Sequence, residues 1–308
     1  MNRLWQAAES FEPRGIQLAL ARLLLAIAQL TMLLSSPDRL LFANPPGATP
    51  ETRCAGLKSV SLWCVTAGDA PGDRPGRILA IAVLLVVASG YRPRWTCVAH
   101  WYVTFSIAVN TTANNGGDRV AEILAMLLIP VCLNDQRIWS WRGPTRPLLP
   151  AWGGSAFAAH AVLRCQTTVI YLHAVISKLA FPAWRHGTAL GVLVHDPQFG
   201  IPGAVQPLAQ QLLSHDWATS LFTWSVLAVE TLIALSMPFG RRTRRCGLVL
   251  AILLHGAIIL LMGLFSFGLI MIALVLATSA DRQPGRSTSD NTRQTAPALV
   301  GPRKGTSS

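Results

Sequence analysis

Long runs of apolar residues, interrupted by short polar segments rich in arginine, proline and glycine, recur along the whole chain. A helix needs about 20 apolar residues to cross a hydrocarbon core about 30 Å thick. The last run has 35 residues, and at about 1.5 Å per residue it would extend roughly 52 Å, so we expect a break near Gly263. We predict an all-α, polytopic transmembrane bundle of about eight helices, with spans at 16–34, 76–91, 96–113, 119–133, 155–181, 220–237 and the two halves of 246–280.

The polar segments between these runs divide the chain into three parts. Residues 1–15 precede a transmembrane domain at 16–280, which carries two long loops at 35–75 and 182–219. Proline and glycine in both loops favour turns and short helices that lie against the membrane. The first apolar run lacks a cleavage pattern, so we predict a retained helix rather than a signal peptide. Residues 281–308 have the Ser-, Thr- and Gly-rich composition of a disordered tail.

Basic residues are distributed unequally between the two sets of loops. When the N-terminus is placed in the cytoplasm, 16 arginines and lysines fall in inner segments and 7 in outer segments. An excess of positive charge marks the cytoplasmic loops of membrane proteins, so both termini are predicted to be cytoplasmic. The strongest single signal is the short loop FGRRTRRC. The preference for arginine over lysine is typical of a GC-rich bacterial genome, and we expect the plasma membrane of a bacterium.

The composition agrees with this topology and argues against a nucleic-acid-binding protein. Of the 308 residues, 51% are hydrophobic and only 13% are charged, and the mean hydropathy is +0.41. The net charge of +12 comes from arginines in short segments between apolar runs, which topology explains better than a nucleic-acid footprint does. The lipid bilayer is therefore the expected partner, and nucleic acid is not.

The six cysteines form no C-x-x-C motif, so neither a zinc ribbon nor a thioredoxin-type site is indicated, and we predict no metal site. Cys54 and Cys64 both lie in the predicted outer loop 35–75, where oxidising conditions favour a disulfide. We predict a structural disulfide, and a redox-active pair is the alternative. The chain also lacks the Walker A, G-x-G-x-x-G, H-E-x-x-H and G-x-S-x-G motifs of common nucleotide-binding and hydrolytic enzymes.

Ionisable residues inside the predicted spans are candidates for function, because an unpaired charge in lipid costs a few kcal/mol or more. Glu230 lies in the middle of its span, so we expect it to be protonated or paired with a basic group. The others also have structural explanations: snorkelling or pairing for Arg22, an i, i+4 pair for His160 and Arg164, hydration near helix ends for His100 and Glu122, and a hydrogen bond between helices for His173.

Lys178 is unusual because the chain has only two other lysines against 23 arginines. It lies near the end of the predicted span 155–181, on the outer side of the membrane. One explanation is an ammonium group that snorkels to the interface. The other is a desolvated amine that gives up its proton and acts as a base at neutral pH, which lysine can do and arginine cannot.

Three stretches, in the same order along the chain, resemble the HTTM domain, which is the membrane domain of vitamin K-dependent gamma-carboxylase. The stretches are VIYLHAVISKLAFPAWRHGTAL, NNGGDRVAEILAMLLIPVCLNDQRIWSW and LLHGAIILLMGLFSFGLIMIALVLA. The resemblance extends over residues 16–280. Within that superfamily the chain looks like the sporulation-delaying protein B (SdpB) family, whose NNGGD-type turn and S-L-W/F-C segment it shares.

The resemblance implies roles for individual residues near the outer leaflet. Lys178 matches the lysine that acts as catalytic base in the carboxylase, and His255 matches the histidine of the closing segment. These two are the catalytic candidates. A quinol- or lipid-facing pocket is implied beside them, with a reduced quinone as the cofactor that the family suggests. The candidate substrate-binding residues are Asn114, Asn115, Asp118, Tyr171, Trp184 and Glu230.

The family implies a role in producing a secreted antimicrobial peptide from a precursor, together with a small SdpA-like partner protein. We therefore expect a factor for maturation or export of such a peptide, with HTTM-type chemistry based on a lysine. Gly116 stands where the carboxylase has a catalytic histidine, so carboxylation of glutamate is not implied. The alternatives are a non-enzymatic transporter, chaperone or immunity factor, and a quinone-linked thiol oxidoreductase that uses Cys54 and Cys64.

Overall fold

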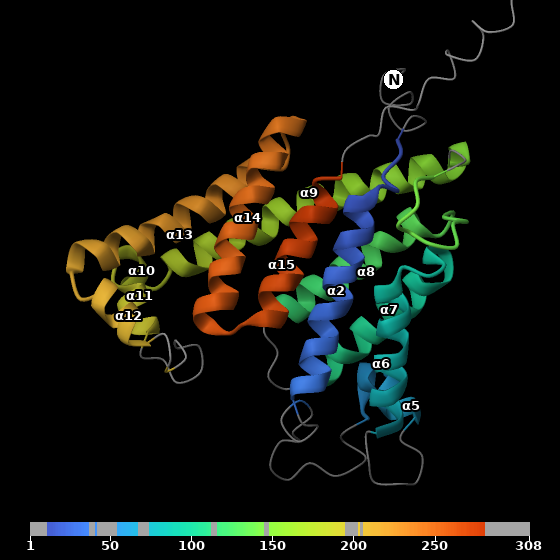
Figure 1. Ribbon diagram of the computed structural model, residues 1–308, viewed down its shortest axis with the longest axis horizontal. Helices are drawn as coiled ribbons and strands as arrows, with labels where there is room; N and C mark the ends of the chain where they lie inside the picture. The colour runs from blue at the N-terminus through green and yellow to red at the C-terminus, as the bar shows by residue number, and fades with distance from the viewer. Residues whose placement is uncertain are drawn as a thin grey trace, which may run out of the picture.

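The described part of the chain is a bundle of helices, which confirms the predicted all-α fold. The computed structural model describes residues 11–36, 41, 54–66, 74–111, 116–144, 148–194, 203 and 206–280. Within these residues, eight helices of 14 residues or more overlap the eight predicted runs (Figure 1). They are α2 (Ile16–Ser35), α6 (Arg74–Ser89), α7 (Pro93–Asn110), α8 (Gly116–Cys132), α9 (Pro150–Leu179), α13 (Asp216–Ser236), α14 (Arg241–Met262) and α15 (Phe265–Thr278).

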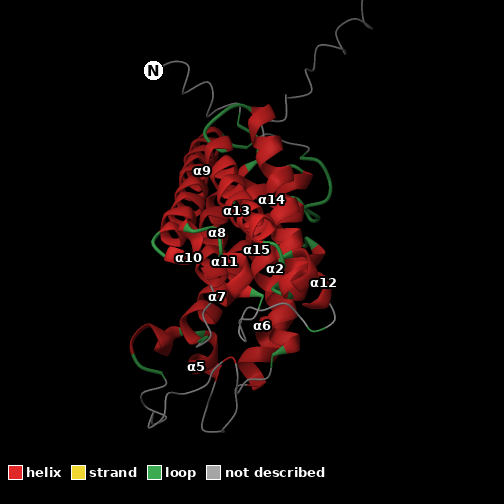
Figure 2. Ribbon diagram, turned by 90° about the vertical axis from the view of Figure 1, so that its left-hand side faces the viewer, coloured by secondary structure: helices red, strands yellow, loops and turns green. Residues whose placement is uncertain are grey.

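Short helices occupy parts of the two segments that were predicted as long outer loops. In the first segment they are the 3-10 helix η1 (Gly56–Val60) and α5 (Leu62–Thr66), and in the second α10 (Pro182–Arg185), α11 (Ala189–Leu193) and α12 (Gln206–Leu212). Figure 2 shows that, among the described elements, helices account for nearly all of the regular structure. The tail after residue 280 lies outside the described residues.

The break that was predicted in the last apolar run is present at Gly263. This residue has a φ angle of 69°, in the left-handed region that glycine adopts without a steric penalty, and it caps the end of α14. Helix α15 begins two residues later, at Phe265. The chain therefore reverses within a few residues, and α14 and α15 pack side by side.

Helices α2 and α15 form the centre of the bundle, with α6 and α7 on one side and α14 on the other (Figure 1). Ala21, Ala26 and Ala28 of α2 are fully buried, as are Ala273 and Ala277 of α15. Small side chains let neighbouring helix backbones approach closely, which is how helices associate when lipid removes the hydrophobic driving force. The start of α2 and the end of α15 lie at the same end of the bundle.

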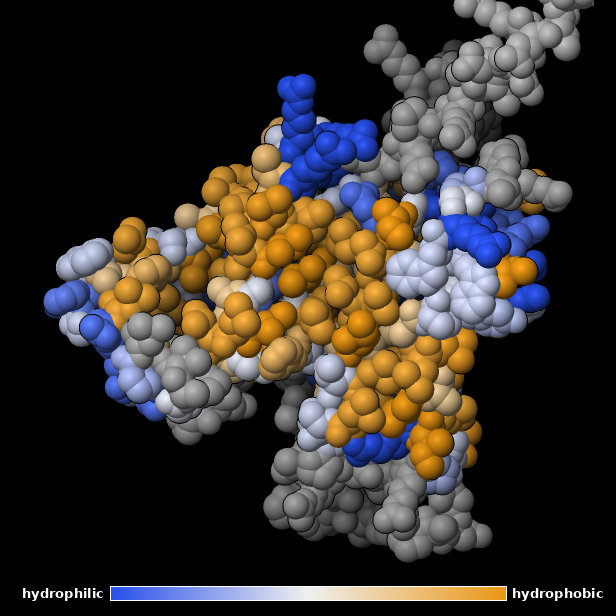
Figure 3. All heavy atoms as spheres, viewed as in Figure 1, coloured by the Kyte–Doolittle hydropathy of each residue, from blue (hydrophilic) through white to orange (hydrophobic). Residues whose placement is uncertain are grey.

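The surface of the bundle is apolar over a broad area that includes α13, α14 and α15 (Figure 3). On α14, Val249, Leu253 and Leu260 are 56%, 65% and 76% exposed, respectively. A contiguous apolar surface of this kind is expected against lipid rather than water. Within the described residues α2, α13 and α14 are long and apolar enough to cross a membrane, while α15 and Pro75–Ser89 are shorter apolar helices.

The predicted disulfide between Cys54 and Cys64 is present. It joins the segment before η1 to α5, and α5 packs against α6 and α7. Trp63 of α5 is buried, and the backbone N–H of Leu62 donates to Ser106 Oγ of α7 at 2.9 Å. The disulfide therefore fixes a small cap on the end of the bundle opposite the start of α14.

Replacing both Cys54 and Cys64 by serine should lower the free energy of unfolding by about 2–3 kcal/mol, because a closed loop of this length restricts the unfolded chain. The measurement is the temperature at which the purified protein in detergent loses its monodisperse gel-filtration peak. Exposed free cysteines provide the control, since Cys165→Ser and Cys246→Ser should leave this temperature unchanged. A double-serine variant as heat-resistant as the parent protein would contradict the structural role.

Candidate functional site

Lys178 and Glu230 form an ion pair between α9 and α13. The Nζ atom of Lys178 lies 2.7 Å from Oε1 and 2.8 Å from Oε2 of Glu230. The Glu230 side chain is 8% exposed and the Lys178 side chain 26% exposed. The expectation that Glu230 is either protonated or paired with a basic group is met by this pair. The two residues were separate candidates in the sequence, and the fold brings them into one site.

The indole ring of Trp184 lies on a second side of the ammonium group of Lys178. Nζ is 5.5 Å from the ring centroid, which is within the range of a cation–π interaction. Trp184 belongs to α10, a single turn that follows α9 after Ala180 and Phe181. The lysine therefore has a carboxylate from α13 and an aromatic face from the connecting segment, and both stabilise its charged form.

Tyr171 and His255 form a second polar pair, between α9 and α14. The Tyr171 hydroxyl lies 2.8 Å from Nε2 of His255, and each residue is 1% exposed. Tyr171 precedes Lys178 by seven residues, so both lie on the same face of α9, roughly 10 Å apart along its axis. One face of α9 thus carries both pairs, with Glu230 and His255 supplied by the next two helices.

The far side of His255 faces α15. Its ring packs edge-on against Phe267, with the ring centroids 5.7 Å apart. A β-carbon at Gly268 would approach the carbonyl oxygen of His255 to 3.0 Å and Ile259 more closely still, so glycine permits this contact between α14 and α15. The Nδ1 atom of His255 is buried and has no hydrogen-bond partner among the described residues. The imidazole therefore has one partnered nitrogen and one nitrogen without a partner there.

The remaining candidates from the sequence are distributed differently. Asn114 and Asn115 lie outside the described residues. Asp118 is buried in the first turn of α8, a helix that packs against α7, α9 and α15. Lys178 and Tyr171 instead find their partners on α13 and α14. The described structure therefore joins four of the candidates in two pairs on α9 and places Trp184 beside one of these pairs. Asp118 belongs to a different helix, α8.

A polar layer lies between α2 and α7. It contains Arg22 and His100, for which the sequence suggested structural explanations rather than a place in the functional site. His100 was expected to be hydrated near a helix end, and this is wrong, since it is 2% exposed and its Nε2 lies 3.1 Å from the Gln29 side-chain oxygen. Gln29 also donates to Thr104 at 2.9 Å, and Arg22, buried at 3% exposure, donates to Thr96 at 2.8 Å. Ionisable residues inside the spans, which include Arg22 and His100, were the candidates from the sequence. Gln29 was not among them, because an amide side chain carries no charge.

Two further basic residues of α9 contact the last turn of α15. Nε2 of His160 lies 3.1 Å from the carbonyl oxygen of Ala277, and Nε of Arg164 donates to that of Thr278 at 3.5 Å. Basic groups at this position satisfy carbonyls that the helix end leaves free and oppose its negative dipole. For His173 the sequence left open ligand binding or a hydrogen bond between helices; its side chain is exposed, and its Nδ1 lies 3.5 Å from Ser177 Oγ of its own helix. These contacts are structural.

The described residues contain no group of three or more His, Cys, Asp or Glu side chains that would hold a metal ion. The two pairs themselves offer a carboxylate, an amine, a phenol and an imidazole. These groups can bind polar atoms and exchange protons. The arrangement is that of a multi-pass helical membrane protein with polar pairs buried between α9, α13 and α14.

Comparisons with known proteins assign this bundle to a family. Residues 77–281 match the HTTM domain, and the chain belongs to the HTTM family. It is 30% identical over 283 residues to the sporulation-delaying protein SdpB of Bacillus subtilis (strain 168), which is 90% of this chain and 84% of SdpB. It is 29% identical over 260 residues to YitO of the same organism, which is 83% of this chain and 82% of YitO. No solved structure matches. The resemblance drawn from the sequence motifs is confirmed.

Lys178→Met should destabilise the protein by about 3 kcal/mol, because it leaves the buried carboxylate of Glu230 without its counter-charge. Glu230→Gln should cost less, since the more exposed lysine can still reach water. The double variant should be more stable than Lys178→Met alone. Thermal unfolding in detergent measures all three, and strictly additive effects would contradict the coupling.

These two single variants and the double variant form a double-mutant cycle. A matched control for it is a second cycle on the ion pair between Arg119 and Glu122 at the start of α8. It has a similar separation of 3.0 Å, but its side chains are 55% and 24% exposed. Removing either partner of a surface pair changes stability by less than about 1 kcal/mol. Burial, and not ion pairing as such, should therefore account for the difference between the two cycles.

Proposed function

We propose that the protein acts in the plasma membrane of a bacterium as a factor for the maturation or export of a secreted antimicrobial peptide. The supporting observation is the similarity to SdpB, which extends over 90% of the chain. An SdpA-like partner and a peptide precursor would be the other components. In this proposal the site on α9 serves the peptide on the outer side of the membrane.

The ion pair defines what Lys178 would need to do as a base. An ammonium group must first lose a proton, and the described groups at hydrogen-bond distance from Nζ are the two oxygens of Glu230. Transfer of that proton to the carboxylate would give a neutral amine beside a neutral carboxylic acid. Loss of hydration penalises both charges of the pair, which reduces the cost of this transfer. The amine could then accept a proton from a bound substrate.

The same geometry supports a second candidate function without chemistry. If the proton stays on Lys178, the site presents a fixed ammonium group flanked by Trp184 and backed by Glu230. Such a site can bind a polar group of a passing peptide and release it unchanged. This is the behaviour of a transporter, chaperone or immunity factor. The observation that favours it is the tight two-oxygen contact, which holds the charged state in place.

The two functions separate at Lys178→Arg, because arginine keeps the positive charge and does not deprotonate. In a strain that lacks the wild-type gene, Lys178→Arg should abolish the mature peptide if lysine is the base and preserve it if the site only binds. Mass spectrometry of the culture medium measures the peptide, and immunoblotting of membranes checks that each variant accumulates. An unchanged peptide in the strain without the gene would refute both functions.

A quinone-linked thiol oxidoreductase remains the third hypothesis, and it predicts that Cys54 and Cys64 are required for activity. The same secretion assay with the double-serine variant addresses it. A normal yield of mature peptide, at a temperature where the variant is folded, would eliminate redox chemistry at this disulfide. Loss of peptide from a folded variant would support it.

The predicted orientation is tested with reporters fused to the full chain. Both termini are proposed to be cytoplasmic, with 35–75 and 182–219 outside. A fluorescent protein after Ser308 should fluoresce, while alkaline phosphatase inserted near Gly203 should be active, since it folds only outside the cytoplasm. The converse pattern would invert the topology and place Lys178 at the inner face.

A further inference from the structure

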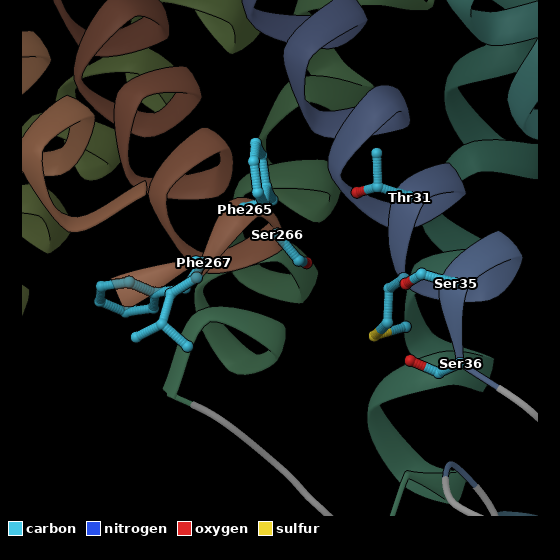
Figure 4. A pocket seen from close by; sticks show the side chains of 9 residues that line it. Thr31, Ser35, Ser36, Phe265, Ser266 and Phe267 are labelled. Atoms are coloured by element: carbon cyan, nitrogen blue, oxygen red, sulfur yellow. The ribbon is translucent and has the colours of Figure 1, made fainter. Parts of the chain in front are cut away.

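A pocket of about 440 Å³ lies where the end of α2 meets the connection between α14 and α15. This volume falls within the range of small-molecule sites. Thr31, Ser35 and Ser36 line it from α2, and Ser266 faces them from the first turn of α15 (Figure 4). The remaining lining residues are Met32, Gly263, Leu264, Phe265 and Phe267.

One wall of this pocket supplies hydrogen-bond donors that lack partners. The Oγ atom of Ser266 is buried and has no hydrogen-bond partner among the described residues. In Figure 4 its side chain extends toward α2, into the pocket. A buried hydroxyl without a partner costs about 1–3 kcal/mol, so a ligand atom that bonds to it would remove a penalty. This feature points to a ligand rather than to a simple gap in packing.

The start of α15 adds backbone donors to the same wall. Its N-cap residue, Leu264, gives no side-chain cap. The backbone N–H groups of Phe265 and Gly268 bond to carbonyls of residues 263 and 264, whereas no described acceptor meets those of Ser266 and Phe267. Unpaired N–H groups and the positive end of the helix dipole together attract oxyanions.

The electrostatic setting of the pocket also favours negative charge. Among the described residues that line it, none has an ionisable side chain. Arg77 of α6 donates to the carbonyl oxygens of Leu33 and Ser36, and the bond to Ser36 is 2.8 Å long. A guanidinium group therefore neutralises the negative end of α2 next to a residue that lines the pocket. The positive end of α15 therefore faces the pocket, while Arg77 offsets the negative end of α2.

Apolar side chains flank the polar groups on both sides of the pocket. Met32, Leu264, Phe265 and Phe267 present thioether, aliphatic and aromatic surface, and Phe265 is 56% exposed. A ligand that fits both walls has an oxyanion at one end and an apolar body at the other. Phe267 is also the ring that packs against His255, so the pocket adjoins the Tyr171–His255 pair.

We infer that this pocket binds an amphipathic molecule with an acyl chain and a carboxylate or phosphate head group. The head group accepts hydrogen bonds from Ser266 Oγ and the first N–H groups of α15, and the chain lies along Met32, Phe265 and Phe267. A free fatty acid and an anionic phospholipid both have this chemistry. The site is separate from the ion pair of Lys178 and does not depend on the proposed function.

The experiment uses the full-length protein, purified in an uncharged detergent, with three diazirine-bearing probes: palmitate, phosphatidylglycerol and hexadecanol. After irradiation, mass spectrometry should locate adducts of palmitate, phosphatidylglycerol or both at residues 31–36 and 263–267. Labelling by palmitate alone would identify a free acid, and labelling by phosphatidylglycerol alone a lipid head group. Hexadecanol has no acidic head group, so it should label these residues at least ten-fold less.

Substitutions at Ser266 and Ser35 test the head-group contact and the space in the pocket. Ser266→Ala should weaken labelling about ten-fold, because it removes a hydrogen bond to a charged group. Ser35→Phe should abolish it by filling the pocket from an exposed position, where the added ring does not disturb the core. Ser225→Ala, an exposed serine of α13, is the matched control and should have no effect. Equal labelling by hexadecanol, no adduct at these residues, or full labelling of Ser35→Phe would overturn the assignment.

Discussion

The ion pair between Lys178 and Glu230 places two charges inside a helical membrane bundle, and the arrangement of α9, α13 and α10 depends on it. The buried carboxylate of Glu230 is costly there without its partner, because lipid offers no water to replace the lost hydration. The two helices must therefore meet at one register, with the lysine and the glutamate opposite each other. An ion pair of this kind contributes more to specificity of packing than to net stability, since hydrophobic side chains could fill the same space.

The same constraint explains the other polar contacts of the bundle. Gln29 meets His100 and Thr104, Arg22 meets Thr96, and Tyr171 meets His255, always between different helices. Each contact satisfies groups that the bilayer cannot. Apolar surfaces of lipid-facing helices give little information on which helix packs against which, so these polar pairs fix the neighbours and their rotation.

Much of the fold follows from the sequence because it depends on local properties. The length of each apolar run sets a helix, Gly263 ends one, and Cys54 and Cys64 are only ten residues apart. The pairs of the site are not local, since 52 residues separate Lys178 from Glu230 and 84 separate Tyr171 from His255. Charge identified the lysine and the glutamate as costly residues. Charge could not show that these two residues pair with each other. It also could not point to Phe267, because phenylalanine is common in any apolar helix.

The turn between α14 and α15 lies between the pocket beside α2 and the Tyr171–His255 pair. Gly263 reverses the chain, and Gly268 lets α15 approach the His255 carbonyl, so Phe267 is held between the His255 ring and the pocket beside α2. Packed aromatic rings do not deform continuously, and a ligand that displaces Phe267 must also alter its contact with His255. Because Tyr171 and Lys178 share one face of α9, a change at His255 reaches the helix that carries the ion pair. A series of direct contacts, from Phe267 to His255 and from His255 to Tyr171, therefore runs from the pocket to the helix that carries Lys178.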